Sequence, residues 1–127
     1  MTLKAEVSAC RILRQWVGLA AHHGGATPDA AKAIELAVGE ALTNAYVHAY
    51  QETAGPLHVG IVIKARRLVV SIRDEGKRVD IPRVPTELSE RGDGYGLFLI
   101  GQVVDEVGIW WDDGMTIRMA MEFPSLN

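Results

Sequence analysis

The spacing of the apolar residues changes from a helical to a strand period close to Pro56, and that change limits the folds open to this chain. Before Pro56, apolar residues recur every three or four positions, as on the buried face of a helix. After Pro56 the period becomes two over 57–64 and 68–74, with Leu57, Val59, Ile61 and Ile63 and then Leu68, Val70 and Ile72 on one face, as in strands with one buried face. Two helices followed by two strands favour an α+β fold.

Glycine, proline and capping residues between these segments indicate where the other helices and strands begin and end. A first helix is predicted to stop at Gly24-Gly25, and a second to begin with Thr27 as N-cap and Pro28 in its first turn. A long loop follows the second strand and leads into a helix over 95–104. Asp113-Gly114 is a hairpin signal between two last strands. We therefore predict a two-layer sandwich of helices on a mostly antiparallel sheet.

Size and charge narrow the class of protein. The 127 residues suit a single domain, and 48% apolar with 23% charged residues is ordinary globular composition. A net charge of -3 argues against direct nucleic-acid binding. No apolar run reaches the ~20 residues of a membrane span. Cys10 is the only cysteine, which excludes an internal disulfide. We expect one cytoplasmic domain over 1–127, with no membrane partner.

Glu40 and Asn44 are the first candidate functional pair. Four positions apart on the second helix, they share one face, with their side chains about 6 Å apart. A carboxylate beside an amide suits Mg²⁺, or a base that orients a hydroxyl. The alternative is a plain polar line on a helix. His48 lies on the same helix face, where its side chain either contacts the ligand of this pair or packs against neighbouring side chains.

Asp74 is the second candidate, because the strand alternation puts it on the buried face at the strand end. A buried carboxylate there can accept a hydrogen bond from an exocyclic amine. The glycine of Asp74-Glu75-Gly76 lets the backbone approach a flat ring. A simple turn is the alternative reading.

The segment Gly92-Asp93-Gly94-Tyr95-Gly96 is the third candidate. Alternating glycines before a helix expose backbone N–H groups and the positive end of the helix dipole, which favours an anion. The segment is not a Walker A loop, because Lys-Ser/Thr does not follow it, and it is not a Rossmann fingerprint, because Leu97 and Leu99 stand at the third-glycine positions. A glycine-rich loop without a phosphate is the alternative.

Taken in order, these segments resemble bacterial anti-sigma-factor serine/threonine kinases, of the GHKL or histidine-kinase-like ATPase superfamily. The segment 36–45, with His48-Ala49-Tyr50, is similar to the family's N-box. Residues 72–76 resemble its adenine-contacting box and 94–100 its phosphate-binding box, while 114–116 resemble its late Gly-x-Thr element. The resemblance covers nearly the whole chain and implies the Bergerat ATP-binding fold.

The resemblance also implies roles for individual residues. Asn44 would hold Mg²⁺ on the phosphates, Asp74 would bind the adenine amino group, and Glu40 would be the general base. Residues 77–93 would form the lid over the nucleotide. The remaining nucleotide-contacting positions would be His48, Gly76, Gly92, Gly94, Tyr95, Gly96, Leu97 and Thr116.

The implied activity is transfer of phosphate from ATP to a serine or threonine of a small anti-anti-sigma (STAS-domain) protein, leaving ADP. Such kinases sequester a sigma factor in a partner switch, and a homodimer is the family expectation. The alternatives are a non-catalytic nucleotide-binding module that sequesters a partner, and a detached histidine-kinase ATPase domain. Two features depart from the family pattern. Arg78 stands at a glycine position, and only residues 1–4 precede the first helix to supply a first strand.

Overall fold

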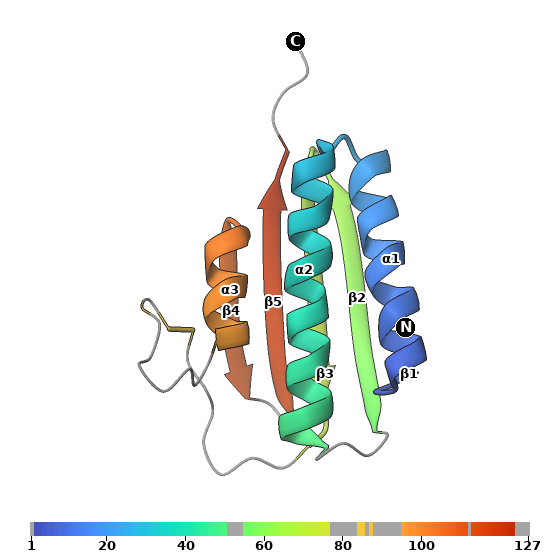
Figure 1. The fold of residues 1–127 in the computed structure, drawn as a ribbon, viewed down its shortest axis with the longest axis vertical. Helices are drawn as coiled ribbons and strands as arrows, with labels where there is room; N and C mark the ends of the chain where they lie inside the picture. Colours follow the sequence, from blue (N-terminus) through green and yellow to red (C-terminus); the bar gives the residue numbers. More distant parts are fainter. Residues whose placement is uncertain are drawn as a thin grey trace.

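Three α-helices cover one face of a five-stranded sheet in the residues that the computed structural model describes, namely 2–50, 55–76, 84–85, 87, 95–111 and 113–123 (Figure 1). The elements follow the chain as β1 (Thr2–Lys4), α1 (Val7–His23), α2 (Pro28–Asn44), a π-helical turn (Ala45–Ala49), β2 (Pro56–Lys64), β3 (Arg67–Asp74), α3 (Tyr95–Val103), β4 (Glu106–Trp111) and β5 (Met115–Glu122).

The sheet has the strand order β1-β2-β3-β5-β4, and each of these neighbouring pairs is antiparallel. The α+β sandwich predicted from the sequence is therefore confirmed. β1 supplies the first strand with three residues only, paired with the start of β2. β4 begins three residues earlier than the predicted strand at 109–111. Within the described residues, no helix combines the length and the hydropathy needed to cross a membrane.

The core lies between the sheet and α2, the central helix (Figure 1). Alternate residues of β3 and β5 point into it, as the period of two predicts. α2 contributes a face rich in alanine, which lets the helix lie close to the strands. Full burial of each large side chain contributes about 1.5–3 kcal/mol. The central buried set is Ile34, Ala37, Val38, Ala41 and Leu42 of α2, with Leu68, Val70, Ile72, Ile117 and Met119 of the sheet.

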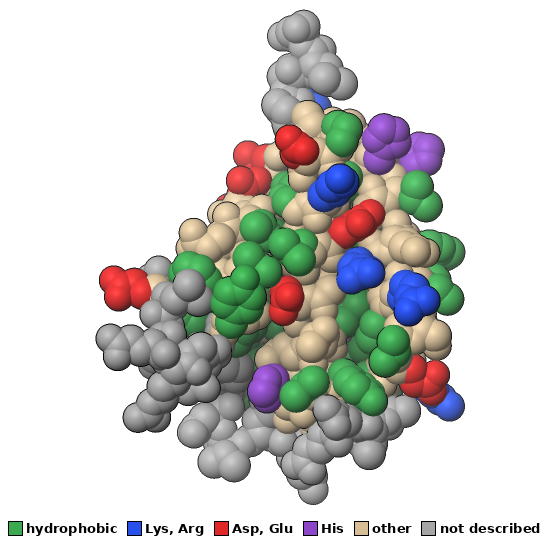
Figure 2. Space-filling view, viewed as in Figure 1, with side chains coloured by type: hydrophobic (Ala, Val, Ile, Leu, Met, Phe, Trp, Pro, Cys, Tyr) green, Lys and Arg blue, Asp and Glu red, His purple; other side chains and the backbone are tan. Residues whose placement is uncertain are grey.

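Only part of the apolar surface of α1 is buried. Leu13, Val17 and Ala21 face the core, whereas Trp16 and Leu19 are each 59% exposed, as is most of Ile12. Both stripes are apolar in the sequence, but only one of them is buried. α1 lies over the edge of the sheet, so a single stripe meets the core. Hydrophobic side chains accordingly line this border of the molecule (Figure 2).

The predicted N-cap of α2 is confirmed, because the hydroxyl of Thr27 accepts a hydrogen bond from the N–H of Ala30 at 3.2 Å. Thr27→Ala removes this acceptor. We expect a loss of about 1 kcal/mol in the free energy of unfolding, or about 3–5 °C in Tm, measured by thermal denaturation. Thr27→Ser keeps the hydroxyl and should stay close to wild type. Equal losses in both variants would assign the effect to the threonine methyl instead.

Candidate functional site

The carboxylate of Asp74 is buried at the end of β3, with 2% of the residue exposed. Its Oδ1 accepts hydrogen bonds from the backbone N–H of Gly76 at 3.1 Å and of Met115 at 3.4 Å. The predicted inward orientation of Asp74 is thus confirmed. Because two backbone segments hold it, this carboxylate offers a fixed acceptor to a ligand rather than a rotating one.

Two glycines bring the backbone close around Asp74. A β-carbon at Gly76 would lie 2.5 Å from the carbonyl oxygen of Ala49, so this turn packs directly on the end of the second helix. Gly114 has φ +143°, and a β-carbon there would overlap the carbonyl oxygen of Asp74. The β4–β5 turn predicted at Asp113-Gly114 is therefore also one wall of the Asp74 site. That contact has no local sequence signal.

Glu40 lies on α2 where this helix meets α3. A β-carbon at Gly96, the second residue of α3, would lie 2.7 Å from Oε2 of Glu40. A side chain at this position would therefore require the Glu40 carboxylate to move. The Glu40 carboxylate consequently lies at the amino end of α3, the positive end of that helix's dipole.

Asn44 closes the last α-helical turn of α2, and its amide nitrogen Nδ2 is buried. This atom has no hydrogen-bond partner among the residues that the structure describes. Buried amide groups are almost always paired, so a water, an ion or a ligand is expected to complete the bonding of this one. Rotation of the amide exchanges nitrogen and oxygen. The group therefore fits either a phosphate oxygen or a metal cation.

No cluster of three or more His, Cys, Asp or Glu residues suited to a metal occurs in the described part of the chain. Mg²⁺ commonly takes one or two protein ligands together with substrate phosphates and waters. Asn44 fits that pattern, because its carbonyl oxygen would be the protein ligand and the nucleotide would supply the rest.

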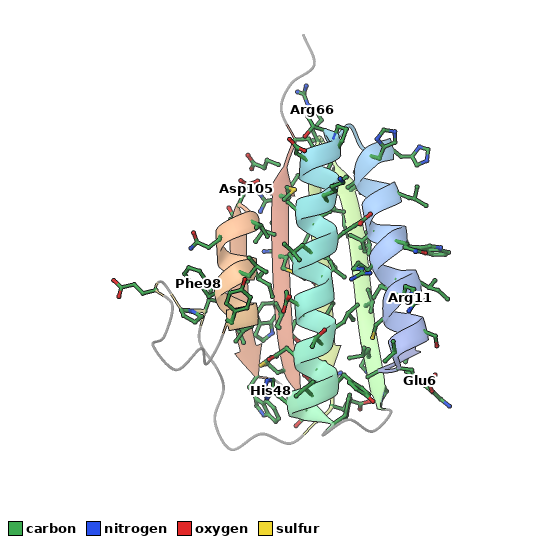
Figure 3. The ribbon with its side chains drawn as sticks, in the orientation of Figure 1. Glu6, Arg11, His48, Arg66, Phe98 and Asp105 are labelled. Atoms are coloured by element: carbon green, nitrogen blue, oxygen red, sulfur yellow. The ribbon has the colours of Figure 1, made fainter. Side chains whose placement is uncertain are left out.

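The second helix changes its hydrogen bonding before it ends. The α-helical hydrogen bonding stops at Asn44, and a π-helical turn over Ala45–Ala49 follows, closed by the N–H of Tyr50 on the carbonyl of Ala45 at 3.1 Å. Such turns are often found at functional sites. His48 is exposed on this turn, at the site end of the second helix (Figure 3).

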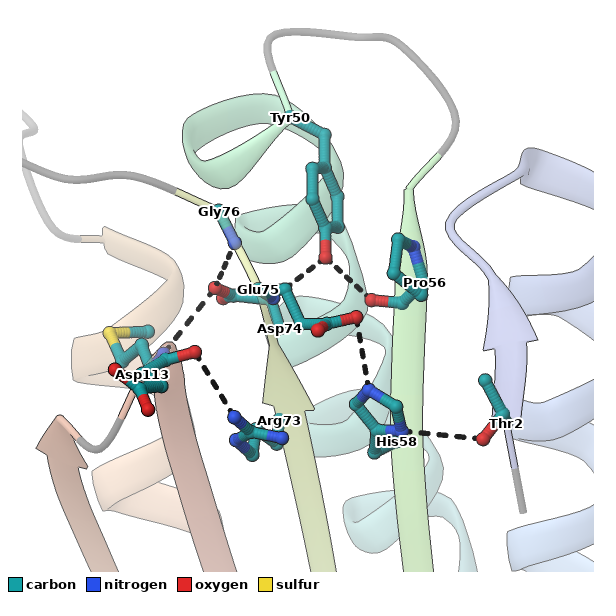
Figure 4. A network of polar contacts seen from close by, with 10 residues as sticks. Thr2, Tyr50, Pro56, His58, Arg73, Asp74, Glu75, Gly76 and Asp113 are labelled. Atoms are coloured by element: carbon teal, nitrogen blue, oxygen red, sulfur yellow. Dashed lines mark hydrogen bonds and ion pairs between the residues drawn. The ribbon is translucent and has the colours of Figure 1, made fainter.

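The Tyr50 hydroxyl connects the π-helical turn to two strands (Figure 4). It accepts the N–H of Glu75 at 2.7 Å and donates to the carbonyl of Pro56 at 2.5 Å. Burial raises the pKa of Tyr50 above its ordinary value, so the hydroxyl keeps its proton. In the sequence, Tyr50 stands at the end of the segment similar to the N-box, and nothing there indicates that its hydroxyl bonds to two strand ends.

The structure does not bring every other predicted site residue to the Asp74 turn. Tyr95 is 54% exposed, whereas the side chain of Leu97 is part of the core, which leaves only its backbone for a ligand. Thr116 is buried on β5, but its register partner Arg73 shows that it lies on the sheet face opposite Asp74. Gly92, Gly94 and Arg78 lie outside the described residues, as does the predicted lid at 77–93 except for residues 84, 85 and 87.

Comparison with known proteins agrees with this architecture. The chain is 28% identical over 129 residues to the serine-protein kinase RsbW of Bacillus thuringiensis (strain Al Hakam) and to that of Bacillus cereus (strain AH820), covering 94% of this chain and 81% of each relative. The histidine kinase domain of the Erythrobacter litoralis EL346 blue-light activated histidine kinase shares the fold. Its TM-score is 0.57 at 22% identity, over 76% of this chain and 46% of that one. A family profile described as histidine kinase-like ATPase domain matches residues 3–121, and the chain belongs to that family.

Proposed function

We propose that this chain is an ATP-dependent protein-serine/threonine kinase whose nucleotide lies between the Asp74 turn, the end of the second helix and the start of α3. The orphaned, buried amide of Asn44, one turn along α2 from Glu40, carries the proposal. Family membership supports ATP as the nucleotide, and the names of the RsbW relatives support a protein serine as acceptor.

Each residue has a distinct part in the proposed reaction. Asp74 accepts a hydrogen bond from the adenine amino group and fixes the base end of ATP. Asn44 would hold Mg²⁺, which offsets phosphate charge when bound. Glu40 takes the proton of the attacking hydroxyl as the serine oxygen bonds to the γ-phosphorus and the bond to ADP breaks. The products are phosphoserine, ADP and a protonated Glu40.

The proposed acceptor is a small anti-anti-sigma protein of the STAS type, and the proposed sequestered partner is a sigma factor. Both proposals rest on the similarity to the RsbW kinases. A cytoplasmic location and a homodimer are proposed on the same ground. The likeness to a solved histidine kinase supports the fold alone, so we do not propose phosphorylation of a histidine.

Asn44→Ala tests the nucleotide site. We expect ATP to bind the wild-type chain more tightly with Mg²⁺ than without it, and this gain to disappear in the variant, measured by titration calorimetry at matched ionic strength. The reason is that alanine removes the proposed protein ligand of the ion.

Thr43→Ala is the matched control, because Thr43 is the preceding residue of α2 and is exposed, and its hydroxyl donates to the carbonyl of Gly39 in its own helix. It should keep the Mg²⁺ dependence. A wild-type gain that survives in Asn44→Ala would refute the metal assignment.

A further inference from the structure

We infer that the Tyr50 hydroxyl is a positioning group that sets the adenine-binding carboxylate of Asp74 relative to the second helix. The inference rests on the proposed function, because it concerns the same nucleotide site. Tyr50 does not touch the reacting atoms, and it acts through the Asp74–Gly76 turn.

The hydroxyl stands where β2 and β3 stop pairing. The antiparallel register ends with Leu57 opposite Asp74, so the next pair would be Pro56 with Glu75. Proline has no N–H, so that pair cannot exchange two backbone hydrogen bonds. The Tyr50 hydroxyl lies between the two strands instead, accepting from the N–H of Glu75 and donating to the carbonyl of Pro56 (Figure 4).

This insertion ties the strand ends to the helix that carries Asn44. Tyr50 directly follows the π-helical turn, and Gly76 packs on Ala49, the residue before it. Its aromatic ring lies against Gly55, where a side chain would overlap it. The helix end, the start of β2 and the end of β3 thus meet at one side chain.

As a consequence, the distance between Asp74, at the base end of the nucleotide, and Asn44, at its phosphate end, is fixed. Asp74 immediately precedes the residue whose N–H the hydroxyl holds, and its Oδ1 is bonded to Gly76 within the same turn. Asn44 is on the other side of the π-helical turn. If the hydroxyl is removed, the turn can shift relative to Asn44, and the carboxylate loses its alignment with the adenine amine while the phosphate end stays in place.

Tyr50→Phe removes this hydroxyl and keeps the ring. The probes are ATP and ITP, because ITP has a carbonyl oxygen where ATP carries the exocyclic amine that Asp74 is proposed to recognise. We expect calorimetry to show ATP bound about five to ten times more weakly, in keeping with loss of the single hydrogen bond between the Asp74 carboxylate and the adenine amine. ITP binding should change little, so the preference for ATP over ITP falls. General loosening of the fold would weaken both nucleotides alike and leave this preference unchanged.

Tyr46→Phe is the matched control. Tyr46 is half-buried on the same helical turn but lines a groove of about 230 Å³ between α1 and α2, away from the Asp74 turn. It should keep the wild-type preference. Gly76→Ala is a second variant that pushes the same turn off Ala49 with the hydroxyl intact, and it should reproduce the loss of preference.

The outcomes separate the two proposals. A wild-type chain that prefers ATP, with an unchanged preference in Tyr50→Phe, overturns the positioning role and leaves the proposed function standing. Should Tyr50→Phe fail to fold, Gly55→Ala decides in the same way, because its β-carbon would overlap the Tyr50 ring and so displace the hydroxyl. A wild-type chain that binds neither nucleotide overturns the proposed function and this inference with it.

Discussion

Replacing Glu40 by glutamine is expected to slow phosphoryl transfer to a protein serine by a factor of about 10²–10⁴, the usual contribution of a general base. Glutamine keeps the size of the side chain but cannot take the hydroxyl proton. The Glu40 carboxylate lies against Gly96 at the amino end of α3, the proposed phosphate side of the site. Because it is not proposed to hold the nucleotide, ATP affinity should stay within about twofold of wild type.

Single-turnover transfer from ATP to a purified STAS-domain anti-anti-sigma protein measures this rate. Glu35→Gln is the matched control: Glu35 is also half-buried on α2, but it packs against Gly18 of α1. It should retain the wild-type rate. Transfer that persists undiminished in Glu40→Gln would disprove the base assignment. A wild-type chain that binds ATP and transfers nothing would favour the non-catalytic sequestering module.

The sheet was predictable because its signal is local. Alternation through Leu68, Val70 and Ile72 reaches Asp74, and a period of two permits only two orientations for each side chain. The structure confirms its burial. The helical period is less decisive. On α1, Leu13 and Ile12 belong to adjacent stripes that both look apolar, and only the position of the helix at the sheet edge determines which stripe is buried.

The hydrogen bonds that hold the Asp74 turn in place were not predictable, since they join segments far apart in the chain. Tyr50 reaches Glu75 across 25 positions, and Met115 reaches Asp74 across 41. The π-helical turn that positions Tyr50 has no distinct composition, because its sequence Ala-Tyr-Val-His-Ala continues the alanine-rich helix with no glycine or proline. The resemblance to a kinase family supplied the roles of Glu40, Asn44 and Asp74. It gave no role to Tyr50 or Met115, whose hydrogen bonds hold the Asp74 turn.

Gly114→Ala should be the most destabilising change considered, because two costs add at one position. At φ +143°, alanine is strained, at about 1–3 kcal/mol. Its β-carbon would also overlap the backbone carbonyl of Asp74, which cannot rotate away as a side chain would. We expect a total loss of about 3–5 kcal/mol in the free energy of unfolding, measured by urea denaturation. The variant should also lose ATP binding, because moving Gly114 pulls the Met115 N–H from Asp74.

Gly25→Ala separates the two costs, since Gly25 also has a positive φ, +105°, but a β-carbon there meets nothing within 4 Å. It should show the strain alone and keep wild-type ATP affinity. The excess loss in Gly114→Ala then measures the contact between the β4–β5 turn and the Asp74 backbone. Equal losses in the two variants, with ATP binding intact in both, would mean that Gly114 merely completes a hairpin and that the Asp74 carboxylate is held without this wall.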